Sequence, residues 1–442
     1  MNIIWKNKKK EVFAWSMYDF ANQPFTTLIV TFIFSAFFTE FLAQDNQQGT
    51  YLWSVGISVT AIFVAFFSPI LGALADSGGY RKLFLVFFSY LSIIATFCLY
   101  FFEPGQLFNF DISFNDTNII HITLDVAILA LIVFVIANIG FEFGTVFCNS
   151  YLSDLATTKD MGKISGYAWG LGFVGGLISL AISFLFLDLQ DEQNIRLINV
   201  LVAIWFIIFS LPTFLFLPDR KPQRGVRRHL QNSFKAIFYS FRNVSEHESI
   251  VRFLIARLFY NDALITIFAF GGIYAAGTLG FNFNEILILG VALNISACIG
   301  SFLFGILEDK IGVKKMIQIT LWSLIFATLL AYLAPFITNY NQVITPKILF
   351  WIAGIIIGFM QGPNQAGSRS LMARLTPDNK KNEFFGFYAF SGKATAFVGP
   401  ALFGILTHLF NQQTGLLIVV LFFLIGLIMF QPLTINNVYN EK

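Results

Sequence analysis

Twelve long apolar segments constrain the fold of this chain more than any other feature of its sequence. They cover approximately residues 13–43, 51–75, 81–103, 122–148, 164–187, 196–217, 251–277, 284–307, 313–336, 346–373, 383–408 and 414–435. A helix needs roughly 20 apolar residues to cross the hydrocarbon core of a bilayer, and each segment reaches that length. Only 12% of the residues are charged and the mean hydropathy is +0.71. The sequence therefore predicts an all-α membrane protein with twelve transmembrane helices.

The basic residues predict how these helices are oriented. If the N-terminus lies in the cytoplasm, the outer loops contain only Arg196 and Lys347 as basic residues. The inner segments then hold nearly all other lysines and arginines, as expected for short cytoplasmic loops. An even number of spans places both termini on that side. The net charge of +3 is explained by this orientation and does not indicate binding to nucleic acid.

One long basic segment divides the chain into two parts. It predicts an N-terminal six-helix half over residues 1–217, a cytoplasmic linker over 218–250 and a C-terminal six-helix half over 251–442. Within the linker, residues 230–241 carry apolar side chains at helical spacing. This pattern predicts an amphipathic helix on the inner membrane surface, held by anionic lipid, with a partner protein as the alternative.

A short motif occurs twice, 233 residues apart. Both copies hold a glycine, an acid and a cation at the same spacing: Gly72, Asp76 and Arg81 in the first, and Gly305, Asp309 and Lys314 in the second. A glycine near a helix end permits close approach of a neighbouring helix, and an acid there can bind a facing helix end. A single copy is also typical of polar residues that merely close a hairpin. Two copies in register favour an internal duplication.

Further repeats support the duplication. Residues 139–144 correspond to 357–362 with an offset of 218, and residues 166–172 correspond to 386–392 with an offset of 220. The segments at 122–148 and 164–187 therefore mirror those at 346–373 and 383–408. Duplicated halves of this kind place a binding site near the bilayer midplane, where the halves meet.

Polar residues inside the spans are the candidates for that site, because a charge in hydrocarbon costs about 2.5–3.5 kcal/mol on insertion scales. For substrate binding or proton coupling we select Asp19, Asn22, Glu142, Asn149, Asp262, Gln361, Gln365 and Lys393. At 1.5 Å per residue, Glu142 lies roughly 18 Å from the inner end of its helix, near the middle. Glu142 or Asp262 could exchange a proton, and Lys393 could hold a substrate carboxylate. Structural ion pairs that only pin helices together are the alternative.

The repeated motif at 72–82 and 305–315 resembles the loop motif of the major facilitator superfamily. The resemblance implies twelve helices in two six-helix halves, with the motif acting as a latch at the cytoplasmic gate. It also implies a cavity lined by the first, fourth, seventh and tenth helices. Polar residues at helical spacing lie on the first, fourth and tenth: Asp19 with Asn22, Glu142 with Asn149, and Gln361 with Gln365. Asp262 lies on the seventh. The residues expected to act in gating are Gly72, Asp76, Arg81, Gly305, Asp309, Lys314 and Arg369.

A closer resemblance rests on residues 18–22, 75–82, 365–377 and 383–400. These stretches are similar to the vacuole effluxer-like branch of the superfamily, which includes the autophagy-related vacuolar amino-acid effluxers. The branch implies amino-acid efflux. The eukaryotic members are larger and vacuolar, whereas this compact chain is typical of a bacterial cell membrane.

The sequence thus predicts a secondary transporter of a small polar or zwitterionic solute that works by alternating access, with protons as the candidate coupling ion. We expect membrane lipid as the surroundings, a monomer, and no cofactor or metal, because the chain has no phosphate-binding loop and no metal-ligand spacing. An exporter of hydrophobic drugs or lipids is the alternative within transport. A membrane scaffold or membrane enzyme is the alternative outside it.

Overall fold

The computed structural model describes residues 8–114, 118–187, 191–218, 247–337 and 345–434. These residues contain twelve helical segments that are long and apolar enough to cross a membrane. The predicted number of spans is confirmed. The amphipathic helix expected at 230–241 lies outside the described residues.

The first half begins with α1 (Lys8–Pro24), η1 (Phe25–Phe32), α2 (Phe34–Phe37) and η2 (Phe38–Leu42), which together form one span. It continues with α3 (Asn46–Gly78), α4 (Arg81–Cys98), η3 (Leu99–Phe101), β1 (Leu107–Phe114), β2 (Asn118–Asp125), α5 (Val126–Asn149), α6 (Leu152–Leu155), α7 (Met161–Phe186) and α8 (Glu192–Phe216).

The second half consists of α10 (Glu248–Leu279), α11 (Phe283–Ile311), α12 (Val313–Leu333), η5 (Ala334–Phe336), α13 (Pro346–Leu375), α14 (Lys381–Lys393), α15 (Val398–Leu409) and α16 (Gln412–Phe430). Helices α14 and α15 are two parts of a single span.

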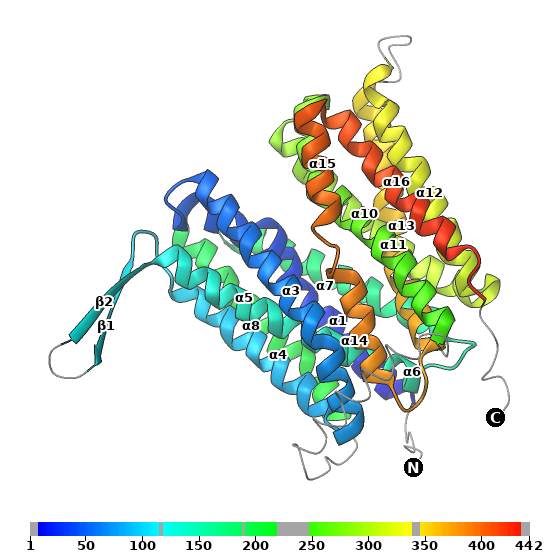
Figure 1. Ribbon diagram of the computed structural model, residues 1–442, viewed down its shortest axis with the longest axis horizontal. Coiled ribbons are helices and arrows are strands. Elements are labelled where there is room, and N and C mark those ends of the chain that lie inside the picture. The colour runs from blue at the N-terminus through cyan, green and yellow to red at the C-terminus, as the bar shows by residue number, and fades with distance from the viewer. Residues whose placement is uncertain (1–7, 115–117, 188–190, 219–246, 338–344, 435–442) are drawn as a thin grey trace.

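The two halves form separate bundles that meet at one end (Figure 1). They converge where α1 begins and α16 ends, and they diverge at the opposite end (Figure 1). The most extensive helix contacts between the halves are those of α3 with α14 and of α7 with α11, and α7 also contacts α13. We refer to these contacts as the α3–α14 seam and the α7–α11 seam, and to this side of the molecule as the closed end.

A β-hairpin projects from the first half near its divergent end (Figure 1). Strands β1 and β2 pair antiparallel, with Leu107 opposite Asp125 and Phe114 opposite Asn118. The apolar segment expected from residue 122 therefore begins too early, because residues 122–125 belong to β2. The hairpin leads into α5, whose first turn is capped by the Asp125 carboxylate, which accepts from the Ala127 N–H.

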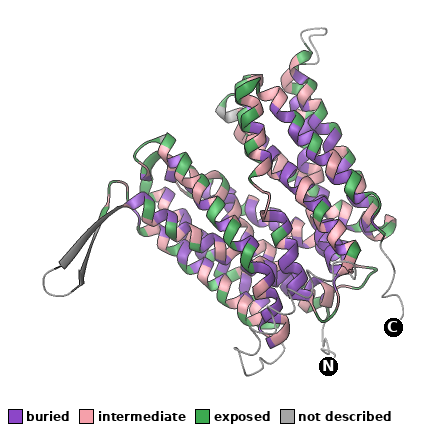
Figure 2. Cartoon of the chain, in the orientation of Figure 1, coloured by how far each residue is buried: buried purple, intermediate pink, exposed green. Residues whose placement is uncertain are grey.

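The surface of the bundles is apolar and many interior positions are small or polar, as expected for helices surrounded by lipid. Leu185 and Phe186 are 77% and 78% exposed, whereas Ser68 and Ser301 are fully buried. Figure 2 shows exposed residues along the outer helix faces and buried residues concentrated where the halves meet. Glycines allow close helix crossings there; Gly386 of α14, for example, packs directly on the backbone of Ser68 in α3.

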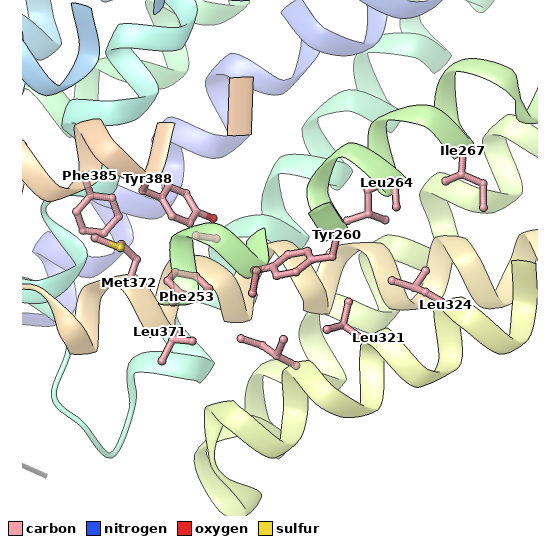
Figure 3. Packing of buried hydrophobic residues seen from close by; sticks show 14 of the residues in the cluster. Phe253, Tyr260, Leu264, Ile267, Leu321, Leu324, Leu371, Met372, Phe385 and Tyr388 are labelled. Carbon is pink, nitrogen blue, oxygen red and sulfur yellow. The ribbon is translucent and has the colours of Figure 1, made fainter. Parts of the chain in front are cut away.

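Apolar side chains fill the interior of the second half. Tyr260 and Leu264 of α10 pack with Leu321 and Leu324 of α12 (Figure 3). The hydroxyl of Tyr260 is hydrogen-bonded to Ser368 Oγ of α13 at 2.8 Å. This packing fixes α10 and α13 relative to each other, and both helices contribute to the cavity described below.

Proline chemistry shapes the first span. Pro24 has no N–H to bond to the carbonyl of Phe20 four residues earlier. The Phe20 carbonyl instead accepts a hydrogen bond from Trp205 Nε1 of α8 at 3.1 Å. The chain then continues in π-helical form from Phe25 to Phe32. Pro24 thus ends the regular part of the span just beyond Asn22.

Candidate functional site: a polar cavity between the halves

A cavity of about 390 Å³ lies between the two halves. Helices α1, α5 and α7 line it from the first half, and α10, α13 and α14 line it from the second. Seven of the eight residues selected for substrate binding or proton coupling face it: Asp19, Asn22, Glu142, Asn149, Gln361, Gln365 and Lys393. Arg369, which we expected to act in gating, also lines the cavity.

An ion pair crosses the cavity from one half to the other. Lys393 Nζ donates a hydrogen bond to Glu142 Oε1 at 2.6 Å. The side chains are 31% and 17% exposed, so both can be reached from the cavity. Lys393 is the last residue of α14 and Glu142 lies in the middle of α5. The pair therefore couples the two halves and offers one cation and one anion to a solute.

Arg369 forms a second connection between the halves. Its Nη1 lies 2.7 Å from Asp19 Oδ2 and 3.1 Å from Asn149 Oδ1. Its Nε and Nη2 donate to the hydroxyl and the carbonyl of Ser165 at 3.0 and 2.8 Å. The guanidinium lies over the Trp15 ring, 4.7 Å from its centroid. Every one of these partners belongs to the first half, although Arg369 belongs to α13 of the second.

A chain of hydrogen bonds orders the second half's side of the cavity. Gln365 donates to Asn261 Oδ1 at 3.2 Å, and Asn261 donates to the Gly392 carbonyl at 3.1 Å. Arg257 donates to the carbonyl of Tyr388 at 2.7 Å and stacks on its ring at 3.7 Å. Arg257 is buried within the protein and does not extend to a membrane surface. These contacts fix the end of α14, where Lys393 lies.

Asp262 lies away from the cavity, in contrast to our expectation. It is 2% exposed, and its Oδ2 accepts from the Gly399 N–H at 3.0 Å in the first turn of α15. Residues 394–397 interrupt the helix between α14 and α15. Asp262 follows Asn261 by one residue, so it points about 100° away around α10. Its observed contact is with the start of α15.

The α3–α14 seam contains the first copy of the repeated motif. Asp76 accepts from the Asn382 side chain at 2.7 Å and from the Glu383 N–H at 2.8 Å. Gly72 packs directly on the backbone of Asn382, where a side chain would collide. An acid at the first turn of α14 interacts favourably with the helix dipole.

The α7–α11 seam contains the second copy and repeats this geometry. Asp309 accepts from the N–H groups of Gly162 and Lys163, both at 2.9 Å, at the start of α7. Gly305 packs on the backbone of Gly162, since a Cβ added to Gly305 would lie 3.1 Å from the Gly162 carbonyl oxygen. The partners at 162 and 163 precede those at 382 and 383 by 220 residues, which is the offset of the second sequence repeat.

The cations of the two motif copies are not equivalent. Arg81 lies 2.7 Å from Asp154 and stacks on Tyr151, so it remains within the first half. Lys314 forms no ion pair with any residue that the structure describes. The cation of the second seam is Arg374, whose Nη2 lies 3.4 Å from Asp309 Oδ1. The expected gating role of Lys314 therefore has no contact to support it.

The loop before α7 also lies at the closed end. Asp160 accepts hydrogen bonds from the N–H and hydroxyl of Thr157 and from Lys8 at the start of α1. Partial burial acts to raise the pKa of Asp160, but these hydrogen bonds outweigh it and lower the pKa below its usual value.

Several residues at the site were missed by sequence reasoning. Trp169 and Tyr388 line the cavity. Glu308, Ser165 and Asn382 take part in contacts between the halves. Glu308 carried a usable signal, because it is a charge next to Asp309 at the end of an apolar segment. Among the described residues, no three His, Cys, Asp or Glu side chains gather to hold a metal ion.

Comparison with known sequences identifies relatives over nearly the whole chain. A family model described as vacuole effluxer Atg22 like matches residues 46–442. The uncharacterized MFS-type transporter YxiO of Bacillus subtilis (strain 168) is 26% identical over 435 residues, which cover 96% of this chain and 94% of that protein. Autophagy-related protein 22 of Pichia angusta is 25% identical over 441 residues, which cover 86% of this chain and 74% of that protein.

Solved structures show the same fold at low identity. The proton:xylose symporter XylE superimposes with a TM-score of 0.70 and 14% identity, covering 96% of this chain and 95% of that one. The human organic anion transporter MFSD10 superimposes with a TM-score of 0.70 and 12% identity, covering 96% of this chain and 99% of that one. A bacterial homologue of the iron transporter ferroportin in an outward-facing state superimposes with a TM-score of 0.69 and 11% identity, covering 97% of this chain and 99% of that one.

The relatives and structural neighbours are transporters, so the alternative of a membrane enzyme is set aside. The family match covers residues 46–442 and includes the greater part of both bundles. The protein belongs to the vacuole effluxer Atg22-like family and is a multi-pass membrane transporter of the major facilitator type.

Proposed function

We propose that the protein moves a small zwitterionic solute of the amino-acid type across the membrane by alternating access, with proton coupling. The Glu142–Lys393 pair in the central cavity carries the proposal. A zwitterion has one carboxylate and one ammonium group. Its carboxylate would bind Lys393 and its ammonium would bind Glu142, so one ion pair is exchanged for two and no buried charge is left unpaired.

The size and lining of the cavity support a small polar cargo. Its volume of about 390 Å³ lies at the lower end of the range for small-molecule sites. Around the ion pair, Asn22, Gln361 and Gln365 offer amide donors and acceptors to a solute. Apolar side chains such as Phe141, Ile265 and Phe385 also line the cavity, but a hydrophobic drug or lipid would offer no charged group to Lys393 or Glu142.

The closed seams support alternating access. With the basic loop residues in the cytoplasm, the closed end is the cytoplasmic end and the cavity opens outward. Asp76 and Asp309 would hold this state, and the halves would rock about the cavity when a solute replaces the direct Glu142–Lys393 contact. Both termini would then be cytoplasmic. We propose a monomer in a bacterial-type cell membrane, with residues 1–217 and 251–442 as the two moving halves.

The test is uptake and counterflow of a radiolabelled amino-acid panel in proteoliposomes, with and without a proton gradient. We expect saturable flux that is lost in Glu142→Gln and in Lys393→Ala. The matched controls are Glu285→Gln and Lys347→Ala, which break a second Glu–Lys pair at 2.8 Å that lies outside the cavity lining. These controls should keep the flux. If no amino acid is transported, the proposed substrate class is wrong.

A further inference from the structure

Glu308 is a buried carboxyl group that does not line the central cavity. It precedes Asp309 on α11 and is 1% exposed. The residue 233 positions earlier, in the first motif copy, is Ala75. The α3–α14 seam is therefore closed without an acid at this position. Closing a seam does not require Glu308, and another role has to account for the cost of burying it.

The side chain of Glu308 lies on the boundary between the halves. A Cβ added to Gly162 of α7 would meet its Cδ, Cβ and Cγ at 2.6–2.8 Å, so Glu308 lies directly against the backbone of the other half. Its Oε1 is hydrogen-bonded to Ser370 Oγ of α13. Its Oε2 has no hydrogen-bond partner among the described residues. Three helices thus enclose the carboxyl group while the seam is closed.

Only one cation among the described residues, Arg374, faces the two neighbouring acids Glu308 and Asp309, so it cannot neutralise both when they are ionised. Asp309 is the second carboxyl group on the same helix, and Arg374 of α13 is the cation that faces both. The guanidinium lies 3.5 Å from Glu308 Oε1 and 3.4 Å from Asp309 Oδ1. Its short hydrogen bond, at 2.6 Å, goes to the carbonyl of Thr158. Arg374 is therefore shared and only weakly paired with Glu308.

The other charged groups nearby point elsewhere. On α7 and its preceding loop, the Lys163 side chain is exposed over Tyr167 and Asp160 pairs with Lys8. Lys310 on α11 and Lys315 on α12 are exposed. Lys314 on α12 forms no ion pair with a described residue, and the residues that α12 buries in this region are the apolar Val313, Met316 and Ile317. Among the residues that the structure describes, no second cation reaches the Glu308 carboxyl group.

We propose that Glu308 is a proton-binding site of the cytoplasmic gate, protonated while the α7–α11 seam is closed and ionised when the seam opens. In the neutral acid, the hydroxyl can donate to Ser370 Oγ and no charge is left without a partner. An ionised carboxylate in the closed seam would leave a charged oxygen, Oε2, buried without a hydrogen bond. In the neutral acid that oxygen is an uncharged carbonyl, which costs less to bury. When α7 moves away, water reaches Oε2 and the proton passes to the cytoplasm.

This site goes beyond the solute cavity, although it rests on the alternating-access part of the proposed function. Proton binding and closure are thermodynamically linked, so a proton that is held only in the closed seam stabilises that seam. We therefore expect low cytoplasmic pH to favour the outward-facing state. Opening the gate would release one proton from Glu308, whichever solute is bound in the central cavity.

The first test uses infrared spectroscopy of the full chain in lipid at several pH values. We expect the carbonyl band of a protonated carboxylic acid at neutral pH in the native protein and a reduced band in Glu308→Gln, which keeps the shape of the side chain. The matched control is Glu248→Gln, at an exposed acid paired with Arg252. Its spectrum should equal that of the native protein. A band unchanged in Glu308→Gln would overturn the proposal.

The second test measures gate opening directly. Spin labels at Lys159 and Lys315, both exposed and on opposite halves, report the distance across the α7–α11 seam in a background without Cys98, Cys148 and Cys298. We expect the distance to increase with pH in the parent and to remain short in Glu308→Gln. An equal response in both proteins, or no response in the parent, would overturn the proposal. Neither readout needs a transported solute, so a failed uptake assay is distinguishable from a failed proton site.

Discussion

Arg369 Nη1 and Asp19 Oδ2 lie 2.7 Å apart, and this contact joins α13 of the second half to α1 of the first. The two side chains are 3% and 13% exposed. Removing one partner of a buried ion pair leaves an uncompensated charge, which typically costs about 3–5 kcal/mol. The contact therefore makes a specific prediction about the stability of the assembled halves.

We expect Arg369→Ala to lower the thermal unfolding temperature of the detergent-solubilised protein clearly, because Asp19 and Asn149 lose their shared donor. Arg252→Ala is the control, since it removes an exposed arginine from an i,i+4 pair worth at most about 0.5 kcal/mol. Equal unfolding temperatures for the two variants would show that the Arg369 contacts do not hold the halves together.

The Glu142–Lys393 pair predicts a difference between folding and transport. Each single change, Glu142→Gln or Lys393→Met, should destabilise the protein because it leaves a charge unpaired in the cavity. The double variant should recover much of that stability but transport no solute. A double-mutant cycle of unfolding temperatures, with flux measured beside it, checks this. Additive losses of stability would mean that the two side chains do not interact.

Gly72 predicts a steric effect on the α3–α14 seam. The methyl group of Gly72→Ala would collide with the backbone of Asn382 in α14, and a backbone cannot move aside as a flexible side chain does. We expect this variant to lengthen the spin-label distance between the cytoplasmic ends of the halves.

Gly404→Ala in α15 is the matched control, because a Cβ there meets nothing within 4 Å. It should leave the distance unchanged and stabilise the helix by roughly 0.5–1 kcal/mol. The steric explanation would be refuted if both variants produced the same distance distribution.

Asp262 predicts a structural rather than a binding effect. Asp262→Asn keeps an oxygen that can accept from the Gly399 N–H, whereas Asp262→Ala leaves the start of α15 without that acceptor. We expect Asp262→Ala to lose about 1–2 kcal/mol of stability and Asp262→Asn to lose little. The substrate KM of Asp262→Asn should equal that of the native protein. A raised KM in this variant would mean that Asp262 contacts the solute.

The repeats in the sequence identified both acids of the seams but not the helices that they contact. The offset of 233 residues relates Asp76 to Asp309, and the offset of 220 relates the backbone positions that they bind. Helical spacing also placed Glu142 and Asn149 on one face, and both line the cavity. These features depend on local periodicity, which a single sequence contains.

The features that were missed depend on how helices are rotated and paired. Asp262 was selected for its charge alone, although the i,i+4 spacing of Arg257 and Asn261 already defined a different face of the helix. The break between α14 and α15 had an available signal in Pro400, whose ring conflicts with the carbonyl of Ala396 four residues earlier. The partner of Lys393 could not be predicted, because Glu142 lies 251 residues away in the chain.

The hydrogen bonds of Asp309 have a consequence for how the sequence can diverge. Both of its oxygens accept from backbone N–H groups, at Gly162 and Lys163. Any residue except proline supplies such a donor, so substitutions at 163 leave these contacts intact. Position 162 is restricted by space, since Glu308 lies against it. Asp76 has one such backbone bond, from the Glu383 N–H, and its other oxygen accepts from the side chain of Asn382. In related proteins, positions 76 and 382 should therefore change together.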